Sequence, residues 1–383
     1  MEKGMTTTIR RMAVITTLLA AIVVALGAYT RLKDAGLGCP DWPGCYGFLT
    51  VPEHVDDVKV AEARFPESPV EAHKGWPEMI HRYFASGLGL LIVIQAVLCV
   101  RYFRRFQKEH REHQTSQRPP LKLPLFLVLL VICQGLFGMW TVTLKLWPQV
   151  VSGHLLGGFA TLSLLFLLTL RVLNQSNQSP SIDRSFVKQM RFSPWAVTGL
   201  VLVVIQVFLG AWTASNYAAV ACPDFPTCQG AWWPEMNLQA GFNLFQSIGP
   251  NYLGGLMDGE SRVAIQMVHR VGALLLTVYL VLMSWRLWGR SARPAKMAIL
   301  LVLAALTVQV SLGIINVLWL IPLPVAVAHN AGGAVLLLSL VYLNFKLYGA
   351  YQSDAHQAEL GQTYLNITKT KAPQFAKNAE VTS

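Results

Sequence analysis

The chain has 383 residues, of which 53% are hydrophobic and only 13% are charged. A composition this apolar and this poor in charge excludes an ordinary soluble protein of the same size and indicates an integral membrane protein. The net charge of +11 would suit nucleic-acid binding in a soluble protein, but here lysine and arginine gather in alternate loops between apolar runs. That distribution is typical of membrane topology and excludes a nucleic-acid partner.

Eight apolar runs are long enough to cross a lipid bilayer, which takes about 20 residues of helix. The predicted spans are 12–31, 79–100, 123–144, 150–170, 194–214, 263–285, 297–320 and 325–345. The first run follows Arg10 and Arg11 and could be a signal peptide. It lacks a small-residue cleavage site and recurs as the fifth run, so we count it as a span.

The loops between these spans alternate in charge. Residues 101–122 carry seven Lys or Arg, and 171–191 and 286–296 carry four each. In contrast, 215–261 has none, and 31–78 has five against nine acidic residues. Because basic loops stay on the cytoplasmic side, we expect both termini in the cytoplasm and the two long loops outside.

The sequence repeats itself at the scale of half a chain. The first span ends in LGAYTRLKDAGLGCPDWPGC and the fifth in LGAWTASNYAAVACPDFPTC, displaced by 183 positions. The motifs QGLFG and GHLLGG return as QVSLG and AHNAGG, displaced by 175, and MIHR returns as MVHR, displaced by 188. We therefore predict an all-α integral membrane protein whose eight transmembrane helices form two tandem, parallel-repeat four-helix bundles.

The repeat divides the chain into five parts. We predict a cytoplasmic N-terminal tail, a first bundle, a cytoplasmic linker, a second bundle and a disordered cytoplasmic tail, at 1–11, 12–172, 173–193, 194–348 and 349–383. The last part is polar and has no periodic apolar positions. Two long outer segments, 46–75 and 229–260, should cover the outer face of the bundles.

Four histidines lie near the outer ends of the spans that run back toward the cytoplasm: His81, His154, His269 and His329. Axial ligation of haem iron needs imidazoles on opposite faces of a flat macrocycle, which facing helices of a bundle can supply. A single histidine in a span is often only a hydrogen-bonded packing residue, but recurrence in both halves favours ligation. The pattern predicts two haem sites.

Pairs of glycines follow two of these histidines by three and four positions. They are Gly157 with Gly158, and Gly332 with Gly333. One turn from a histidine on the same helix face, missing side chains would leave room for a ring. Paired glycines in a span can also be only a helix contact.

Charged residues beside the histidines distinguish the two halves. Arg82 and Arg270 could each pair with a haem propionate, although an arginine at a span end can also reach out to water. Glu78 precedes His81 by one helical turn, but the matching residue in the second half is Gln266. A carboxylate can act as base or proton carrier and glutamine cannot, so the first half is the better candidate for chemistry. The alternative is that Glu78 is only a solvated acid at the start of a helix, without a catalytic role.

Four of the six cysteines form two closely spaced pairs in the outer loops. These are Cys39 with Cys45 in GCPDWPGC and Cys222 with Cys228 in ACPDFPTC. An oxidising compartment permits disulfides there, and neither loop has a histidine between its cysteines to support a metal site. We expect two local disulfides. Cys99 and Cys133 lie inside spans and should be small core residues.

Taken together, EMIHR, HLLGG, AHNAGG and the two cysteine loops with GLGCPDWP resemble the haem A synthase family from about residue 12 to 345. The resemblance implies oxidation of the C8 methyl of haem O, through hydroxylated intermediates, to the formyl group of haem A. Haem A is the cofactor of haem-copper terminal oxidases. The resemblance therefore implies haem O as substrate and a bacterial cytoplasmic membrane as location.

The resemblance also assigns roles to single residues. It implies that His269 and His329 hold a haem b in the second half, while His81 and His154 face the substrate haem in the first. Glu78 would match the family's essential acid. A haem O synthase and a terminal oxidase are candidate partners, and the oligomeric state and the electron acceptor stay open.

Two other classes of protein were weighed. A di-haem electron carrier of the cytochrome b kind would place its haems at two depths, whereas these histidines all lie toward one side. A transporter built on a parallel repeat would carry polar residues near the middle of the membrane, and this chain has few.

Overall fold

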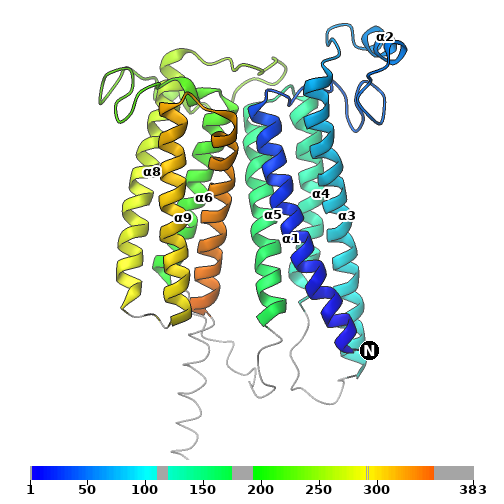
Figure 1. Cartoon of the computed structure of the whole chain (residues 1–383), viewed down its shortest axis with the longest axis vertical. Coiled ribbons are helices and arrows are strands. Elements are labelled where there is room, and N and C mark those ends of the chain that lie inside the picture. The colour runs from blue at the N-terminus through cyan, green and yellow to red at the C-terminus, as the bar shows by residue number, and fades with distance from the viewer. Residues whose placement is uncertain (1, 110–119, 175–192, 290, 292, 349–383) are drawn as a thin grey trace, which may run out of the picture.

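The computed structural model describes residues 2–109, 120–174, 193–289, 291 and 293–348. Within these ranges the regular structure is helical, apart from two isolated β-bridges in the outer loops. In chain order (Figure 1) the helices are α1 (Glu2–Leu32), α2 (Val55–Arg64), α3 (Ala72–Glu109), α4 (Lys122–Thr143), α5 (Pro148–Asn174), α6 (Pro194–Ser215), η2 (Ala218–Val220), α7 (Leu238–Gly241), α8 (Gly259–Trp288), α9 (Arg293–Leu318) and a C-terminal membrane helix (Leu323–Tyr348). Eight of these are long and apolar enough to cross a membrane, so this is a multi-pass membrane protein.

The membrane helices form two bundles side by side (Figure 1). The first contains α1, α3, α4 and α5, and the second contains α6, α8, α9 and the C-terminal membrane helix. At the seam α5 packs against α6, where the hydroxyls of Ser152 and Ser215 are 3.1 Å apart. The tandem bundles are confirmed. Their exact boundaries stay predictions, because most of the linker and all of 349–383 lie outside the described residues.

Two helices begin earlier than the apolar runs predict. Helix α1 begins at Glu2, so most of the predicted tail forms its first turns, and α3 begins at Ala72, ahead of the predicted span 79–100. Hydropathy reports only the part of a helix in hydrocarbon, whereas the backbone stays helical into the polar zone. As a result, Glu78 lies well inside a helix.

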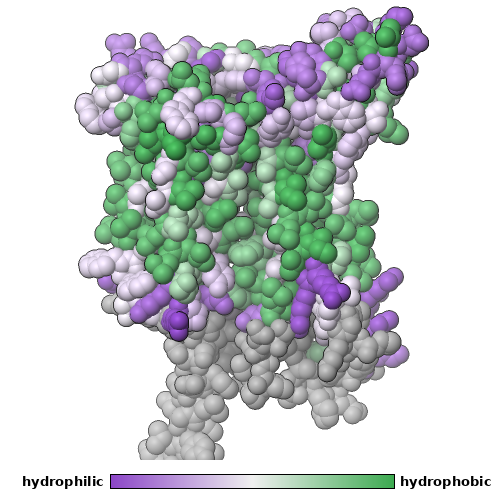
Figure 2. Space-filling model, in the orientation of Figure 1, coloured by the Kyte–Doolittle hydropathy of each residue, from purple (hydrophilic) through white to green (hydrophobic). Residues whose placement is uncertain are grey.

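The outward faces of the bundles are covered with apolar side chains. Leu18, Leu90 and Leu274 are each more than half exposed. Figure 2 shows the resulting hydrophobic belt, with hydrophilic residues gathered above and below it. Such a belt would be unstable in water and is of the kind covered by lipid.

A continuous core joins the two bundles. Leu165 and Leu168 of α5, Leu280 of α8 and Leu340 of the C-terminal membrane helix are fully buried in the same cluster. Cys99 is also buried in this cluster, as expected, while Cys133 is partly exposed; both are free thiols. The two halves therefore pack as one body.

The two cysteine loops have the same internal structure. The expected disulfides are present, Cys39 to Cys45 and Cys222 to Cys228, with Cα atoms 4.7 and 4.6 Å apart. Asp41 accepts bonds of 2.6 and 2.8 Å from the two backbone N–H groups after the second cysteine. In the second loop, the equivalent Asp224 accepts bonds of 2.6 and 3.0 Å. Each loop is therefore a small folded unit.

The Asp224 carboxylate is held in its charged form. The hydroxyl of Thr227 and the backbone N–H groups of Gly230 and Gln229 donate to it and lower its pKa to about 2. A carboxylate whose pKa is lowered on folding contributes stability above its unfolded pKa, near 3.8, and loses it as the pH falls toward 2. The second loop should therefore keep this contact at any pH used for assays.

Candidate functional site

His81 on α3 and His154 on α5 face one another inside the first bundle. Their ring centroids are 6.4 Å apart and the ring planes are at 89°. Two imidazoles bound to opposite sides of one iron, with metal–nitrogen bonds of about 2.0 Å, would have centroids roughly 6 Å apart. The pair is therefore spaced to hold one metal ion, as the axial ligation of a haem requires.

Unpartnered ring nitrogens support the same fit. The Nδ1 atoms of His81, His154 and His329 are shielded from water and have no hydrogen-bond partner. Buried polar atoms without a partner are rare in folded proteins, and a missing ligand is one cause. These three Nδ1 atoms therefore lack a partner, while the rings of His81 and His329 make other contacts, to the backbone of Val23 and to Gln309.

The second bundle brings together His269 of α8 and His329 of the C-terminal membrane helix. The two rings lie near enough to interact electrostatically. A glutamine contacts each ring: Gln206 Nε2 is 3.1 Å from His269 Nδ1, and Gln309 Nε2 is 3.4 Å from His329 Nε2. The structure therefore gathers the four histidines into one pair per bundle. Their ligation of haem stays a prediction.

Each of the four histidines also lies against a glycine of a neighbouring helix, which sequence reasoning missed. If each glycine were given a Cβ atom, that atom would lie very close to Cε1 of the histidine ring. In the first bundle the distances would be 2.9 Å for Gly27 to His81 and 3.4 Å for Gly138 to His154. In the second bundle they would be 3.3 Å for Gly210 to His269 and 3.0 Å for Gly313 to His329. These glycines occupy matching places in LGAYT and LGAWT, and in QGLFG and QVSLG. Their repetition was the signal that could have identified them.

The glycine pairs after two of the histidines are not equivalent positions. Gly158 faces open space, in keeping with the expected room for a ring. Gly157 and Gly332 instead lie directly against the side chains of Gln134 and Gln309. One glycine of each pair therefore accommodates a glutamine from the adjacent helix.

Arg82 and Arg270 hold the cysteine loops. Arg82 donates to the carbonyl of Gly44, and Arg270 donates to the carbonyls of Thr227 at 2.8 Å and Cys222 at 2.9 Å. Each arginine thus ties a disulfide loop to the helix that carries the adjacent histidine. The Nε atom of Arg270 is shielded from water and has no partner, so a donor is left over. Pairing with haem propionates stays a prediction.

Glu78 bonds the first disulfide loop to α3, the helix that carries His81. One carboxylate oxygen is 2.5 Å from an Arg82 nitrogen, and the other accepts the backbone N–H of Cys39 at 3.0 Å. The residue is only 4% exposed, so it is not a solvated acid at the start of a helix. The equivalent Gln266 is also buried, but its carbonyl oxygen has no partner. Among the described residues, the bond from a loop N–H to this helix position is therefore particular to the first half, whereas the arginine bonds to the loops occur in both.

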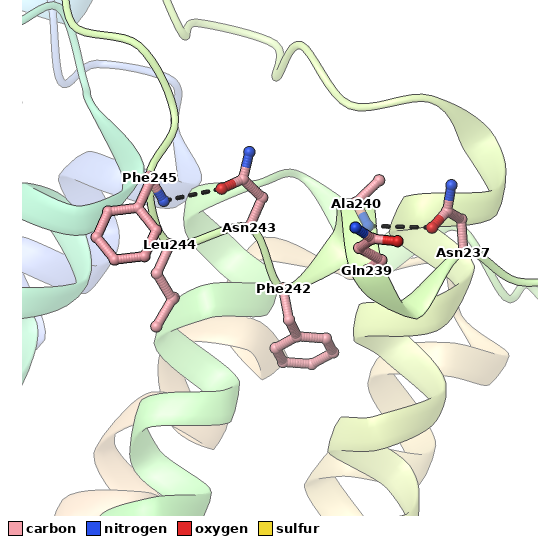
Figure 3. Close-up of a pocket in the computed structure, with 7 residues that line it drawn as sticks. All are labelled: Asn237, Gln239, Ala240, Phe242, Asn243, Leu244 and Phe245. Atoms are coloured by element: carbon pink, nitrogen blue, oxygen red, sulfur yellow. Dashed lines mark hydrogen bonds between the residues drawn. The ribbon is translucent and has the colours of Figure 1, made fainter.

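A surface pocket of about 530 Å³ lies at the cysteine-loop end of the second bundle, around α7 (Figure 3). Its lining consists of Asn237, Gln239, Ala240, Phe242, Asn243, Leu244 and Phe245. None of these side chains titrates, and two of the amides bond to the loop backbone, Asn237 to Ala240 and Asn243 to Phe245. The histidine pairs, and not this pocket, carry the groups needed for chemistry.

The fold and the site together define a class: a multi-pass membrane protein with two helical bundles, each of which contains a pair of histidines. The chain matches the COX15-CtaA family, described as cytochrome oxidase assembly protein, over residues 10–341. It belongs to that family.

Curated relatives agree with this assignment. A haem A synthase of Shewanella oneidensis is 43% identical over 334 residues, which cover 87% of this chain and 95% of the relative. Haem A synthases of Chelativorans sp. and Paracoccus denitrificans are each 30% identical, over 85% and 89% of this chain and over 86% and 87% of their own lengths. The similarity therefore spans both bundles.

Proposed function

We propose that this protein is a haem A synthase, which oxidises the C8 methyl of haem O, through hydroxylated intermediates, to the formyl group of haem A. Family membership and the names of the relatives support an enzyme of haem A biosynthesis. The observation that carries the proposal is the facing pair His81 and His154, 6.4 Å apart, with the buried Glu78 one turn from His81.

The two bundles have different tasks in this proposal. His81 and His154 bind the substrate haem in the first bundle, whereas His269 and His329 hold a resident haem b in the second. The resident haem supplies one-electron transfer when bound. The unused Nε donor of Arg270 is the group that we assign to a propionate of that haem.

The residues of the first bundle orient the substrate and handle protons. The glycine contact at Gly27 fixes the His81 ring, and the disulfide loop bonded to Glu78 covers the site from the outer side. Oxidising a methyl group to a formyl group with the oxygen of one water molecule releases four electrons, which an external electron acceptor must take, and four protons, which the Glu78 carboxylate is placed to accept or relay. Arg82 holds that carboxylate in position.

The protein would work in the bacterial cytoplasmic membrane with both termini in the cytoplasm, as the basic loops indicate. The histidine pairs would then lie toward the outer side of the membrane. A haem O synthase supplying the substrate and a terminal oxidase receiving the product are the partners that this activity requires.

The proposal predicts that membranes containing haem O and no other haem A source will form haem A when this chain is expressed. Haem extracted from those membranes would be separated by chromatography and identified by mass. The double variant His81→Leu/His154→Leu should yield only haem O. Failure of the wild-type chain to form haem A, with the protein present in the membrane, would rule out the activity.

Replacing Gly27 by alanine should lower haem A formation about tenfold to 100-fold, since small misplacements of reacting groups have costs of that size. The added methyl group would lie 2.9 Å from His81 Cε1, so the ring must move. The matched control is Gly87→Ala on α3, where an added Cβ meets nothing within 4 Å. Equal haem A yields from the two variants would show that the glycine does not position the histidine.

Removing the first disulfide should damage activity more than removing the second. In Cys39→Ala/Cys45→Ala the loop that donates to Glu78 is released, whereas in the described part of the chain the carbonyl oxygen of Gln266 has no hydrogen-bond partner from the second loop. We expect at least about a tenfold lower haem A yield than in Cys222→Ala/Cys228→Ala, since general acid–base help is worth about 10²–10⁴-fold. Mass mapping without reduction would first verify both disulfides in the wild type. Equal losses in the two variants would contradict this coupling.

A further inference from the structure

The side chain of Gln206 contacts His269 in the second bundle, whereas at the equivalent place in the first bundle only the backbone of Val23 bonds to His81. The Gln206 side-chain nitrogen lies 3.1 Å from His269 Nδ1 and donates to the His269 carbonyl at 2.9 Å. Among the four histidines, His269 alone has a partner for Nδ1 within the described residues. This ring is therefore held by a hydrogen bond as well as by packing.

A glycine makes room for the glutamine. A Cβ at Gly272, three residues after His269 on α8, would lie only 2.5 Å from the Gln206 side-chain oxygen. The amide therefore lies flat against a surface without side chains, next to the ring. Gln206 and Gly272 fit together as a pair.

The first bundle has replaced both members of this pair. With the displacements of 183 and 188 that align the repeats, Gln206 corresponds to Val23 and Gly272 to Phe84. The Val23 side chain has no hydrogen-bonding group, so His81 bonds only to the backbone of Val23, and the Phe84 side chain leaves no bare helix surface beside it. The other ring glutamine, Gln309, is matched by Gln134, so it does not distinguish the halves.

A residue that hydrogen-bonds the non-ligating nitrogen of a metal-bound imidazole has a known physical effect. Residues that bond the far ring nitrogen fix the tautomer and the ring orientation, and losing them typically costs 10–100-fold in metal affinity or activity. When Nε2 of His269 faces iron, Nδ1 carries the proton, so the amide would turn its carbonyl oxygen toward Nδ1 and give up its bond to the His269 carbonyl. Gln206 is thus suited to hold the ring for ligation.

We propose that Gln206 is a positioning residue that makes the second bundle retain its haem, and that Val23 at the equivalent place leaves the first bundle free to exchange substrate for product. This inference rests on the proposed function, in which one haem is resident and the other must leave. It assigns the difference to one side-chain contact and not to the histidines, which both halves share.

The test measures haem release from purified, haem-loaded protein into excess apomyoglobin, followed by absorbance. Gln206→Met keeps the side-chain length without the hydrogen bond, and Gln206→Val copies the first half. Both should release haem b about 10–100-fold faster than wild type. Their low-spin electron paramagnetic resonance signal should also shift or broaden, because the His269 ring is free to turn.

The matched control is Gln95→Met on α3. Gln95 is a buried glutamine bonded to Thr16 at 2.9 Å, and the equivalent residue in the second half is Met283. This variant loses one buried amide far along the helix from His81 and should release haem b at the wild-type rate. A rate equal to those of the Gln206 variants would show a general loss of packing and overturn the positioning role.

The experiment distinguishes failure of the positioning role of Gln206 from failure of the proposed function. If His269→Leu loses haem b but both Gln206 variants release it within about twofold of wild type, the positioning role is wrong and the proposed function stands. If His269→Leu keeps the full haem b content, the haem assignment of the second bundle is itself wrong. A variant that does not fold is replaced in the comparison by the other Gln206 variant.

Discussion

Replacing Glu78 by glutamine should stop oxidation at haem O or its hydroxylated form while the second bundle keeps its haem b. The change preserves the shape of the side chain and copies Gln266 of the other half. It removes the group that can take up protons and the charge that pairs with Arg82 at 2.5 Å. General acid–base assistance is worth roughly 10²–10⁴-fold, so we expect haem A to fall by that order.

The matched control for this change is Glu71→Gln. Glu71 lies just before α3 and pairs with Lys74 at 2.7 Å, but it is more exposed and makes no contact with the histidine helix near His81. The Glu71→Gln substitution removes one carboxylate from the same loop and should leave haem A formation unchanged. A normal haem A yield from Glu78→Gln would show that the buried carboxylate serves only to anchor the Cys39 loop.

The membrane fold could be predicted from the sequence because its physical constraints are local. Every span must hide about 20 residues of backbone in hydrocarbon, which leaves a continuous apolar run. The repeat then assigned the spans to two bundles, and intramembrane histidines are too costly to occur four times by chance. These features need no knowledge of which helices touch.

Side-chain partners could not be predicted in the same way. The contact of Gly27 with His81 depends on how α1 packs against α3, and the bond from Cys39 to Glu78 depends on how a loop folds back over α3. Arg82 illustrates the consequence. The sequence indicated a propionate partner, and the structure shows a loop carbonyl and Glu78, which the spacing of the motif does not reveal.

The repeat nevertheless contained more information than was read from it. Comparing the halves for shared residues identified the histidines, whereas comparing them for differences identifies what separates their tasks. The difference between Glu78 and Gln266 is visible in the sequence because a charge is lost. The difference between Gln206 and Val23 is not, since the sequence does not show that position 206 faces His269, 63 residues away.

Replacing His269 or His329 by leucine should abolish the low-spin haem b spectrum of the purified protein. Each imidazole would be one of two axial ligands, and leucine has no atom that can bind iron. The two rings lie near each other in the second bundle, so both substitutions should affect the same haem. Haem content per protein and the visible spectrum together measure the loss.

The control variants for this experiment are His81→Leu and His154→Leu in the first bundle. Their rings are 6.4 Å apart in the other bundle, so these variants should keep the haem b spectrum and lose haem A formation. Loss of activity is expected in all four variants, because electron transfer from the substrate would also fail without haem b. Only the spectrum separates the two halves. A haem b spectrum that survives His329→Leu but disappears in His154→Leu would reverse the assignment of resident and substrate sites.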